Sequence, residues 1–386
     1  MVSTGVQLSG EEKTKAMDFS VKKFDLLREL SLTQGVVERK TTIPILSHLL
    51  CEAKGGQLSI SATDLELSIQ AACPIKLKKE GAGTIPAKKL LELVRLLPDG
   101  EIRFRLLENH WIQITSDRKT YKMVGMAKDN FPAVPAFPHP LVTIPAKILS
   151  SLIAKTAFAI SMEESRYTLN GALLILKPDT IAMVATDGHR LAVAETDHKF
   201  AGLSNEARTL VPKKAMIEIQ RLADEAGEEQ QIEFARDESH LFFKVGERLL
   251  ISRILTGQFP NYEAVLPRDN NKSITLERAE FNDAVRRVAQ LADQRSHAVK
   301  FSIGAEGVEL SASSPEYGEA REQIEKEYKG EPLSIGFNGQ YLLDFLAAAP
   351  DGPINIELKD EQSAGQLRPL ADEQYRYRYI IMPMRI

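Results

Sequence analysis

The stretch IAMVATDGHRLAVAE, residues 181–195, decides the fold, because its pattern occurs three times in the chain. Apolar and small residues alternate on both sides of a central turn, which is typical of two half-buried strands joined as a hairpin. The two other copies are LSISATDLELSIQA at 58–71 and VELSASSPEYGEAREQI at 308–324. Recurrence at this distance predicts that one structural unit is present three times.

Three further kinds of segment recur around these copies, in the same order each time. A short strand that leads into an amphipathic helix starts at Phe19, Val142 and Ile274, positions about 120 to 130 residues apart. A second strand and helix follow in GTIPAKKLLELVRLL, RTLVPKKAMIEIQRLAD and LSIGFNGQYLLDFLAAA. Each copy closes with a strand and a tail, in YKMVGMAKDNFPAVP, LISRILTGQFPNYEAVLP and YRYIIMPMRI. Chance does not repeat four segments in one order three times, so we predict a triplicated chain.

Each repeat predicts an α+β domain, in which an antiparallel sheet buries one face under two helices. Pro86 and Pro212 stand where the second helices of the first two repeats begin, and Asn338 matches them in the third. Proline suits the first helical turn, where its missing N–H costs nothing. We place the helices at 22–34, 86–97, 145–158, 212–224, 277–292 and 338–349. The predicted domains are 17–140, 141–267 and 268–386, preceded by a polar, aperiodic and therefore disordered extension at 1–16.

The composition excludes several classes of protein. The 386 residues are 43% hydrophobic and 26% charged, which fits a folded chain of two or three domains. Cys51 and Cys73 are the only cysteines, and each lies in an apolar stretch, so we expect core residues rather than a disulfide framework or a metal site. The sequence has no apolar run long enough to span a bilayer and no secretory signal, so we expect a cytoplasmic protein.

Positive charge is concentrated in the six predicted helices. The chain carries a net charge of -4, yet these helices together carry about +5 and the remainder about -9. Similar domains can pack head to tail and close a ring, and basic helices inside a ring can hold DNA by its phosphates. The alternative is a solvated helix face. The candidate cations are Lys22, Lys23, Arg28, Lys88, Lys89, Arg95, Lys147, Lys155, Lys213, Lys214, Arg221, Arg286 and Arg287. The sequence shows no helix-turn-helix, zinc finger or aromatic platform, so contacts to the DNA backbone are expected rather than contacts to bases.

Five motifs carry a resemblance to a known family. They are RYTLNG at 166–171, ATDGHRLAV at 185–193, FPNY at 259–262, IGFN at 335–338 and MPMR at 382–385. From Met17 to Ile386 the chain resembles the bacterial DNA polymerase III beta subunits. The resemblance implies a sliding clamp, a head-to-tail homodimer of three-domain subunits with sheets outside and helices inside around duplex DNA. It also implies partnership with the replicative polymerase, the clamp loader and repair polymerases, and it implies no catalytic residue, metal or cofactor.

The resemblance implies three sets of site residues. A pocket between the second and third domains, which binds short linear motifs of partners, would be formed by Leu169, Thr186, Gly188, His189, Arg190, Leu191, Pro260, Val265, Asn338, Tyr341, Ile381, Met382, Pro383, Met384 and Arg385. Contacts to DNA would come from Lys40, Lys88, Lys89, Arg95, Arg166, Tyr167, Lys213 and Lys214. The two subunits would meet through Tyr121, Met123, Gln290 and Leu291. Methionine surfaces adapt to different apolar partners, and the polar rim can hydrogen-bond a peptide.

Two positions depart from the family pattern at the pocket. Ala264 stands where family members can place an arginine, and Ser296 stands where an aromatic residue can follow the third-domain helix. Both changes weaken the rim of the pocket.

Two other functions stay open at this point. An enzyme could use Asp187, His189 and Arg190 as acid, base and anion clamp, and Asp64 with Glu66 could bind a metal. The repeat argues against catalysis, because Asp64 matches Asp187 as a turn residue and the copy TDLEL lacks both histidine and arginine. The second alternative is a repeat-built scaffold that binds proteins but not DNA, which would leave the helix charges as a solvated face.

Overall fold

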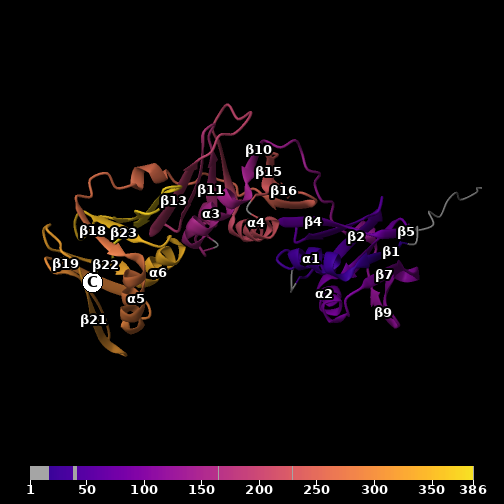
Figure 1. The fold of residues 1–386 in the computed structure, drawn as a ribbon, viewed down its shortest axis with the longest axis horizontal. Coiled ribbons are helices and arrows are strands. Elements are labelled where there is room, and N and C mark those ends of the chain that lie inside the picture. Colours follow the sequence, from indigo (N-terminus) through magenta and orange to yellow (C-terminus); the bar gives the residue numbers. More distant parts are fainter. Residues whose placement is uncertain (1–16, 38–40, 164, 228, 386) are drawn as a thin grey trace, which may run out of the picture. The chain divides into compact units, whose positions relative to one another are not determined.

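The computed structural model describes residues 17–385, apart from 38–40, 164 and 228. The predicted extension at 1–16 therefore lies outside the described residues, as does Lys40. The chain forms two compact units (Figure 1). One unit runs up to Pro138 and includes Phe242–Ser252, and the other contains His139–Leu241 and Arg253–Ile386.

The first unit contains two antiparallel sheets. One sheet has the strand order β5 (Lys76–Lys79), β1 (Asp18–Lys22), β7 (Glu101–Leu106), β8 (Trp111–Ser116) and β9 (Lys119–Val124). The strands of the other follow the order β17 (Arg248–Arg253), β4 (Leu67–Pro74), β3 (Gln57–Thr63), β2 (His48–Lys54) and β6 (Gly81–Pro86). Alternate residues of β1 are buried, as the period of a strand requires, and Phe19 stacks on Phe104 of β7 with ring centroids 5.1 Å apart.

The second unit contains an eight-stranded antiparallel sheet with strands from both the second and the third repeat. Its order is β14 (Ala207–Pro212), β11 (Gly171–Leu176), β12 (Thr180–Thr186), β13 (Arg190–Asp197), β25 (Arg376–Ile381), β24 (Gly365–Pro369), β23 (Pro353–Leu358) and β18 (Lys272–Glu277). A four-stranded sheet follows the order β21 (Gly318–Glu325), β20 (Gly307–Ser314), β19 (Ala298–Gly304) and β22 (Leu333–Asn338). In addition, β10 (Val142–Pro145) pairs with β15 (Gln231–Arg236).

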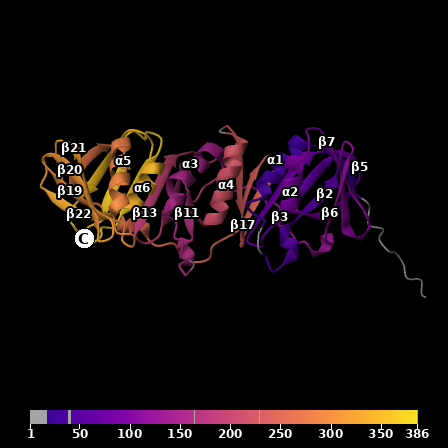
Figure 2. The same cartoon turned by 90° about the horizontal axis from the view of Figure 1, so that it is seen from below.

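The helices pack in three pairs, one for each repeat (Figure 2). The pairs are α1 (Lys23–Thr33) with α2 (Ala87–Leu96), α3 (Ala146–Thr156) with α4 (Lys213–Ala226), and α5 (Arg278–Val288) with α6 (Gly339–Ala348). Pro86 and Pro212 each stand one residue before the first helical residue, rather than inside the first turn as predicted. Asn338 takes the same place before α6, and its side chain accepts hydrogen bonds from two backbone N–H groups of the first turn. The predicted triplicated α+β fold is confirmed.

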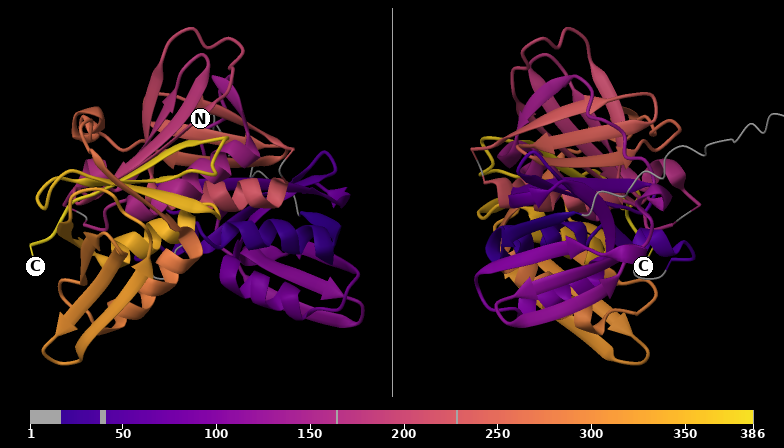
Figure 3. Two further views of the ribbon diagram at one scale, coloured as in Figure 1. Left: turned by 60° about the vertical axis from the view of Figure 1, so that its left-hand side comes forward. Right: turned by 90° about the vertical axis from the view of Figure 1, so that its right-hand side faces the viewer.

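One joint between strands occurs twice. In each case the strand that follows the hairpin turn of one repeat pairs with the closing strand of the next repeat. Thus β4 pairs with β17, where Ile69 lies opposite Leu250, and β13 pairs with β25, where Val193 lies opposite Arg378. The corresponding strands for a third joint are β21 and β9, and each stands at the end of its sheet within the described chain (Figure 3). A strand at an open edge presents unpaired N–H and C=O groups that can pair with another strand.

A buried ion pair secures the first of these joints. Glu29 on α1 is 1% exposed, and its carboxylate accepts hydrogen bonds from Arg248 of β17 at 2.9 and 3.0 Å. The neighbouring Arg28 donates a third hydrogen bond at 2.8 Å. Both carboxylate oxygens are thereby satisfied, as a buried charge requires. The pair fixes β17, which belongs to the second repeat by sequence, to a helix of the first.

The two cysteines are core residues, as predicted. Cys51 and Cys73 are free and buried, and burial raises the pKa of each thiol to about 12. Both thiols therefore stay protonated and unreactive at neutral pH. Among the helices that the structure describes, none has the length and apolar character needed to cross a membrane.

Candidate functional site

The recurring Thr-Asp turn has the same hydrogen bonds in the first two repeats. The carboxylate of Asp187 accepts the backbone N–H groups two and three residues later, at 2.9 and 3.1 Å. The carboxylate of Asp64 does the same, at 2.9 and 2.6 Å. In each turn the residue that follows the aspartate has a positive φ, namely Gly188 at 90° and Leu65 at 78°. The prediction that these aspartates are turn residues is confirmed, and the described chain contains no cluster of three or more side chains that could hold a metal ion.

Arg190 extends this turn into a buried network in the second repeat. Its guanidinium is 9% exposed and donates to Asp187 at 3.0 Å, to Asp344 at 2.6 Å and to the carbonyl oxygen of Phe158 at 2.7 Å. It also lies 4.1 Å from the centre of the Tyr341 ring, in a cation–π contact. Because Asp344 and Tyr341 belong to α6, the network ties the hairpin turn of the second repeat to a helix of the third.

An apolar cavity of about 200 Å³ opens beside this network. Its walls come from the β12–β13 hairpin, the two short 3-10 helices Tyr167–Leu169 and Tyr262–Val265, and the end of β25. Val265 and Met382 are 58% and 50% exposed, so large apolar side chains stand uncovered at the cavity. The lining residues are Leu169, Thr186, Gly188, His189, Arg190, Leu191, Pro260, Asn261, Tyr262, Val265, Ile380 and Met382.

Nine of the fifteen predicted pocket residues line this cavity, and the other six do not. Tyr341 contacts Arg190 through its ring, and Asn338 caps the helix that carries Tyr341. The last three predicted residues line a different depression, of about 740 Å³, in which the N–H of Met384 donates to the carbonyl of Gly336 at 2.8 Å. That depression is formed by Pro383, Met384 and Arg385 with Lys300, Ser334, Ile335, Gly336, Glu361 and Gln362.

Three lining residues, Asn261, Tyr262 and Ile380, were not predicted from the sequence. The first two belong to the FPNY motif that carried the resemblance, so the signal was present. Ile380 lines the cavity, whereas its neighbour Ile381, which was predicted, is fully buried on the ladder opposite Arg190. Successive residues of a strand face opposite sides, so the sequence needed the register to choose between them.

The cavity contains one tyrosine, Tyr262, and the Arg190 network beside it contains another, Tyr341. Burial raises the pKa of Tyr262 and of Tyr341 above the ordinary value, so both keep the hydroxyl proton at neutral pH. Next to Ala264, which stands where an arginine was expected, Glu263 lies 3.7 Å from Arg208. An arginine from β14 is thus near this side of the rim.

The predicted DNA-binding cations lie mainly on the second helices of the first two repeats. Lys88 and Lys89 of α2 are exposed, and their amines lie 3.9 and 3.0 Å from Glu92. Arg95 is exposed in the last turn of the same helix. Lys214 is exposed at the start of α4.

Three other predicted DNA-binding residues, Lys213, Arg166 and Tyr167, belong to the second unit. The amine of Lys213 contacts the sulfur of Met162 at 2.8 Å, and burial together with the charge of Arg190 lowers its pKa. Arg166 donates to the carbonyl oxygen of Asp187 at 2.8 Å, and Tyr167 is 72% exposed.

One of the cations predicted on the six helices is buried rather than exposed. Lys155 is only 9% exposed, and its amine is bound to Asp372 at 2.8 Å and lies 5.0 Å from the rings of Tyr375 and Tyr377. The prediction that Lys155 faces DNA is wrong, because the side chain serves the packing of α3 against the end of the chain.

The four predicted dimer residues lie at the two open sheet edges. Tyr121 and Met123 belong to β9 and lie opposite two buried residues of β8. Their side chains therefore project from the face of the sheet that covers the core. Gln290 and Leu291 lie in the 3-10 helix that follows α5, and this helix contacts β20 and β21. Gln290 is exposed and Leu291 is half-buried.

Comparison with known proteins gives one family over the described chain. Three family models match in order: the N-terminal domain of the DNA polymerase III beta subunit over residues 17–135, the central domain over 143–261 and the C-terminal domain over 263–385. Curated relatives named beta sliding clamp include those of Pseudomonas putida, 32% identical, and Caulobacter vibrioides, 34% identical, each covering 96% of this chain and 100% of the relative. A solved Pseudomonas aeruginosa sliding clamp bound to griselimycin is 32% identical with a TM-score of 0.90 and the same coverage of both chains.

The Arg190 network predicts a specific loss of stability. Arg190→Ala leaves two partly buried carboxylates and a carbonyl without their donor, so we expect the free energy of unfolding to fall by about 2 to 4 kcal/mol. Arg190→Lys should recover less than half of that loss, because an ammonium group cannot reach three acceptors in one plane. Urea unfolding measures both values. The exposed Arg268→Ala is the control, and a loss for Arg190→Ala no larger than for this control would contradict the role of the network.

Proposed function

The chain belongs to the family of DNA polymerase III beta subunits, the bacterial sliding clamps, and we propose here which of its residues carry out each part of that function. A sliding clamp is a non-catalytic processivity factor that acts with DNA and a polymerase in replication. The observation that carries the proposal is the strand joint that occurs twice within the chain and leaves a third pair of edges open. The proposed domains are 17–140, 141–267 and 268–386, and the proposed place of action is the cytoplasm.

The assembly is a head-to-tail homodimer in which β21 of one subunit pairs with β9 of the other. Repetition of the β4–β17 and β13–β25 joint supports this pairing, because equivalent surfaces of similar domains tend to be used in equivalent ways. Two such contacts close a ring of six domains. In this pairing, Tyr121 and Met123 of one subunit contact the surface around Leu291 of the other. Gln290 lies at the margin of that contact.

Charge complementarity supports the same pairing. The strand β9 carries Lys119 and Lys122 and no acid, whereas β21 carries three glutamates and one arginine. Glu322 binds Arg287 of its own chain at 3.0 Å, and this contact lowers the pKa of Glu322. Glu319 and Glu325 are therefore the carboxylates assigned to the partner's basic edge.

The assembly predicts the mass in solution. Light scattering at micromolar concentration should give about twice the 42.9 kDa mass of one chain. Leu291→Asp should give one chain, because a carboxylate at an apolar contact lacks a partner. Leu370→Asp changes a leucine that is 52% exposed on another surface and should leave the dimer intact. A wild-type protein that stays monomeric, or a Leu291→Asp variant that stays dimeric, would rule out this joint.

The DNA contact is assigned to Lys88, Lys89 and Arg95 on α2, to Lys213 and Lys214 on α4, and to Arg166 and Tyr167, with Lys40 from the sequence argument. Lysines and arginines on helix surfaces bind phosphates without reading bases, which permits sliding. The exposure of Lys88 and Lys89 supports their assignment. Lys213 is weaker support, because its amine is partly buried against Met162.

Removal of the two α2 lysines should reduce the salt dependence of DNA binding. For Lys88→Ala/Lys89→Ala, the slope of log affinity against log salt should become shallower by roughly 0.9 for each phosphate that the variant no longer neutralises. Fluorescence anisotropy with linear duplexes of different sequence measures this slope, which should not depend on the sequence. The exposed Lys54→Ala is the control. An unchanged slope in the double variant would remove α2 from the DNA surface.

The cavity beside Arg190 is assigned to short linear motifs of partner proteins, including the replicative polymerase, the clamp loader and repair polymerases. Its uncovered Val265 and Met382 and its protonated Tyr262 suit an apolar peptide that needs one or two hydrogen bonds. A cavity of about 200 Å³ holds a few side chains rather than a folded surface. The separate depression at Pro383, Met384 and Arg385 would hold a flanking part of such a motif.

A relative's structure is bound to griselimycin, and we propose that this chain binds the same compound at the cavity. Calorimetry should detect its binding to this chain, and Met382→Asp or Val265→Asp should weaken binding at least tenfold, since each places an unpaired carboxylate at an apolar contact. The control is again Leu370→Asp, which changes an exposed leucine outside the cavity. Equal binding by all variants would place the ligand elsewhere.

A further inference from the structure

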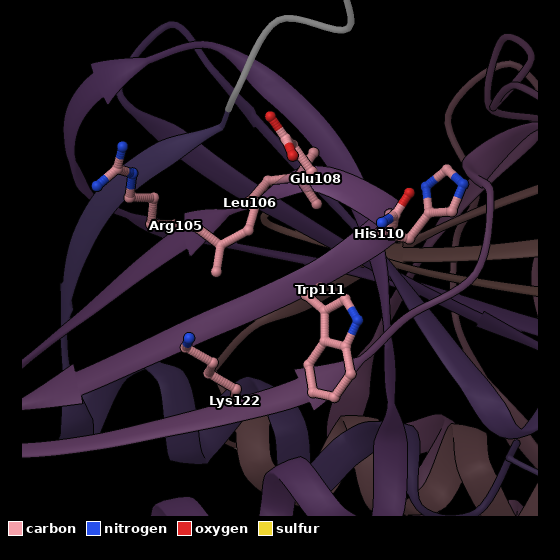
Figure 4. Close-up of a pocket in the computed structure, with 8 residues that line it drawn as sticks. Arg105, Leu106, Glu108, His110, Trp111 and Lys122 are labelled. Atoms are coloured by element: carbon pink, nitrogen blue, oxygen red, sulfur yellow. The ribbon is translucent and has the colours of Figure 1, made fainter.

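A cavity of about 650 Å³ lies in the third repeat, beside the strand β18. Its lining residues form two continuous segments, 271–275 and 326–331. None of these residues is assigned above to DNA, to partner motifs or to the subunit joint. The cavity shown in Figure 4 differs in this respect, because it includes Lys122 of β9, the strand that belongs to that joint.

The first repeat has a strand ladder at the equivalent place. There β5 pairs with β1, and Asp18 lies opposite Lys79. Counted back from the helices that follow, Ser273 takes the place of Asp18 in the third repeat. By the same count, Glu331 takes the place of Lys79. However, β18 stands at the end of its sheet, and the segment 326–331 contains no strand. The third repeat therefore has a cavity where the first repeat has a ladder.

The segment 326–331 directs part of its backbone away from its own sheet. The N–H groups of Lys326 and Tyr328 donate to carbonyls of the turn between β19 and β20, at 3.1 and 3.3 Å. The N–H groups between and after them, on Glu327 and Lys329, have no hydrogen-bond partner within the described chain. Successive residues of a pleated segment point to opposite sides, so these two groups are directed away from that turn.

The strand β18 presents unpaired backbone groups from the other side of the cavity. It pairs with β23 along one edge only, so every second residue keeps its N–H and C=O free on the open edge. Ser273 and Thr275 both donate to the side-chain oxygen of Asn355, at 2.6 and 3.2 Å, and so share one face. Ile274 between them is buried on the opposite face. A strand added here would need polar and apolar side chains in alternation.

The volume of the cavity fits a short strand. In a layered sheet, an extended residue takes about 3.3 Å along the strand, 4.8 Å across the ladder and 10 Å between layers, or roughly 160 Å³. The 650 Å³ of the cavity therefore corresponds to about four residues.

The charge around the cavity favours an acidic occupant. Three lysines line it, Lys272, Lys326 and Lys329, but only two carboxylates. Each carboxylate is already near a lysine, because Glu327 lies 3.1 Å from Lys329 and Glu331 lies 3.5 Å from Lys272. The strand β5, which fills the equivalent place in the first repeat, carries three lysines and would be repelled here. Like charges on neighbouring strands destabilise a sheet, and opposite charges stabilise it.

We propose that this cavity binds, by strand addition, an extended segment of a partner protein in which acidic and apolar residues alternate. The segment pairs with the open edge of β18 on one side and with Glu327 and Lys329 on the other. Main-chain hydrogen bonds supply the affinity in this mode of recognition. The lysines and the buried face at Ile274 select the side chains.

A fluorescein-labelled peptide of sequence GEVEVG is the probe, and fluorescence anisotropy measures its binding to the full chain. It should bind at concentrations up to about a millimolar, and the peptide GKVKVG should bind at least about tenfold more weakly. The same GEVEVG peptide with both valine nitrogens methylated should also lose about tenfold or more, because methylation removes two donors from one edge of the strand. A purely electrostatic contact would be insensitive to this methylation.

A charge-reversed variant tests the lysines. Lys326→Glu/Lys329→Glu should weaken binding of GEVEVG about fivefold or more, since both side chains are exposed and face the probe as like charges. The matched control is Lys54→Glu/Lys199→Glu, which makes the same change of charge at two exposed positions outside the cavity and should bind like the wild type.

Hydrogen exchange measured by mass spectrometry locates the bound probe. Saturating GEVEVG should slow exchange about threefold or more in 271–275 and 326–331, and not in the hairpin turn that carries Arg190. The proposal is overturned if GEVEVG does not bind at a millimolar, if methylation leaves its affinity unchanged, or if protection appears in other elements instead. Protection of β18 that rises with chain concentration in the absence of probe would assign the edge to a second copy of the chain and would also overturn it.

Discussion

The antiparallel pairing between the hairpin strand of one repeat and the closing strand of the next is the interaction on which the rest of the structure depends. In the β13–β25 ladder, Arg190 lies opposite Ile381. This register brings the Thr-Asp turn of the second repeat next to the end of the last strand, and the cavity forms where the two meet. The site therefore follows from the joint, because neither repeat alone contains all of its walls.

The same turn appears at both joints, and the apolar cavity lies beside the turn of the second joint. At the first joint Leu65 and Leu67 occupy the positions that Gly188 and Arg190 hold at the second. A buried guanidinium is costly unless its donors are satisfied, and Arg190 meets this condition with two carboxylates, one carbonyl and an aromatic ring. Its orientation is thereby fixed without a ligand, which would lower the ordering cost of the binding proposed for the cavity.

The sequence predicts whatever depends on local pattern. The helix pairs, the three-fold repeat and the role of Asp64 and Asp187 as turn residues follow from periodicity and from comparison between the copies. The choice between Ile380 and Ile381 needed the register of β25, which a run of adjacent apolar residues leaves undetermined. Burial of Lys155 could not be predicted either, because its partner Asp372 is more than two hundred residues away along the chain.

The charges on the two open edges limit how these strands can pair. An exposed edge strand is a hazard, since it can pair with any other edge, including a copy of itself. A β9 strand against another β9 would oppose lysines with lysines, and a β21 strand against another β21 would oppose a predominantly acidic edge with its own copy. Like charges directly opposite each other destabilise a sheet. Pairing of β9 with β21 is the arrangement that these charges favour. The same residues that would promote the proposed head-to-tail joint would therefore disfavour the head-to-head and tail-to-tail contacts that prevent a ring from closing.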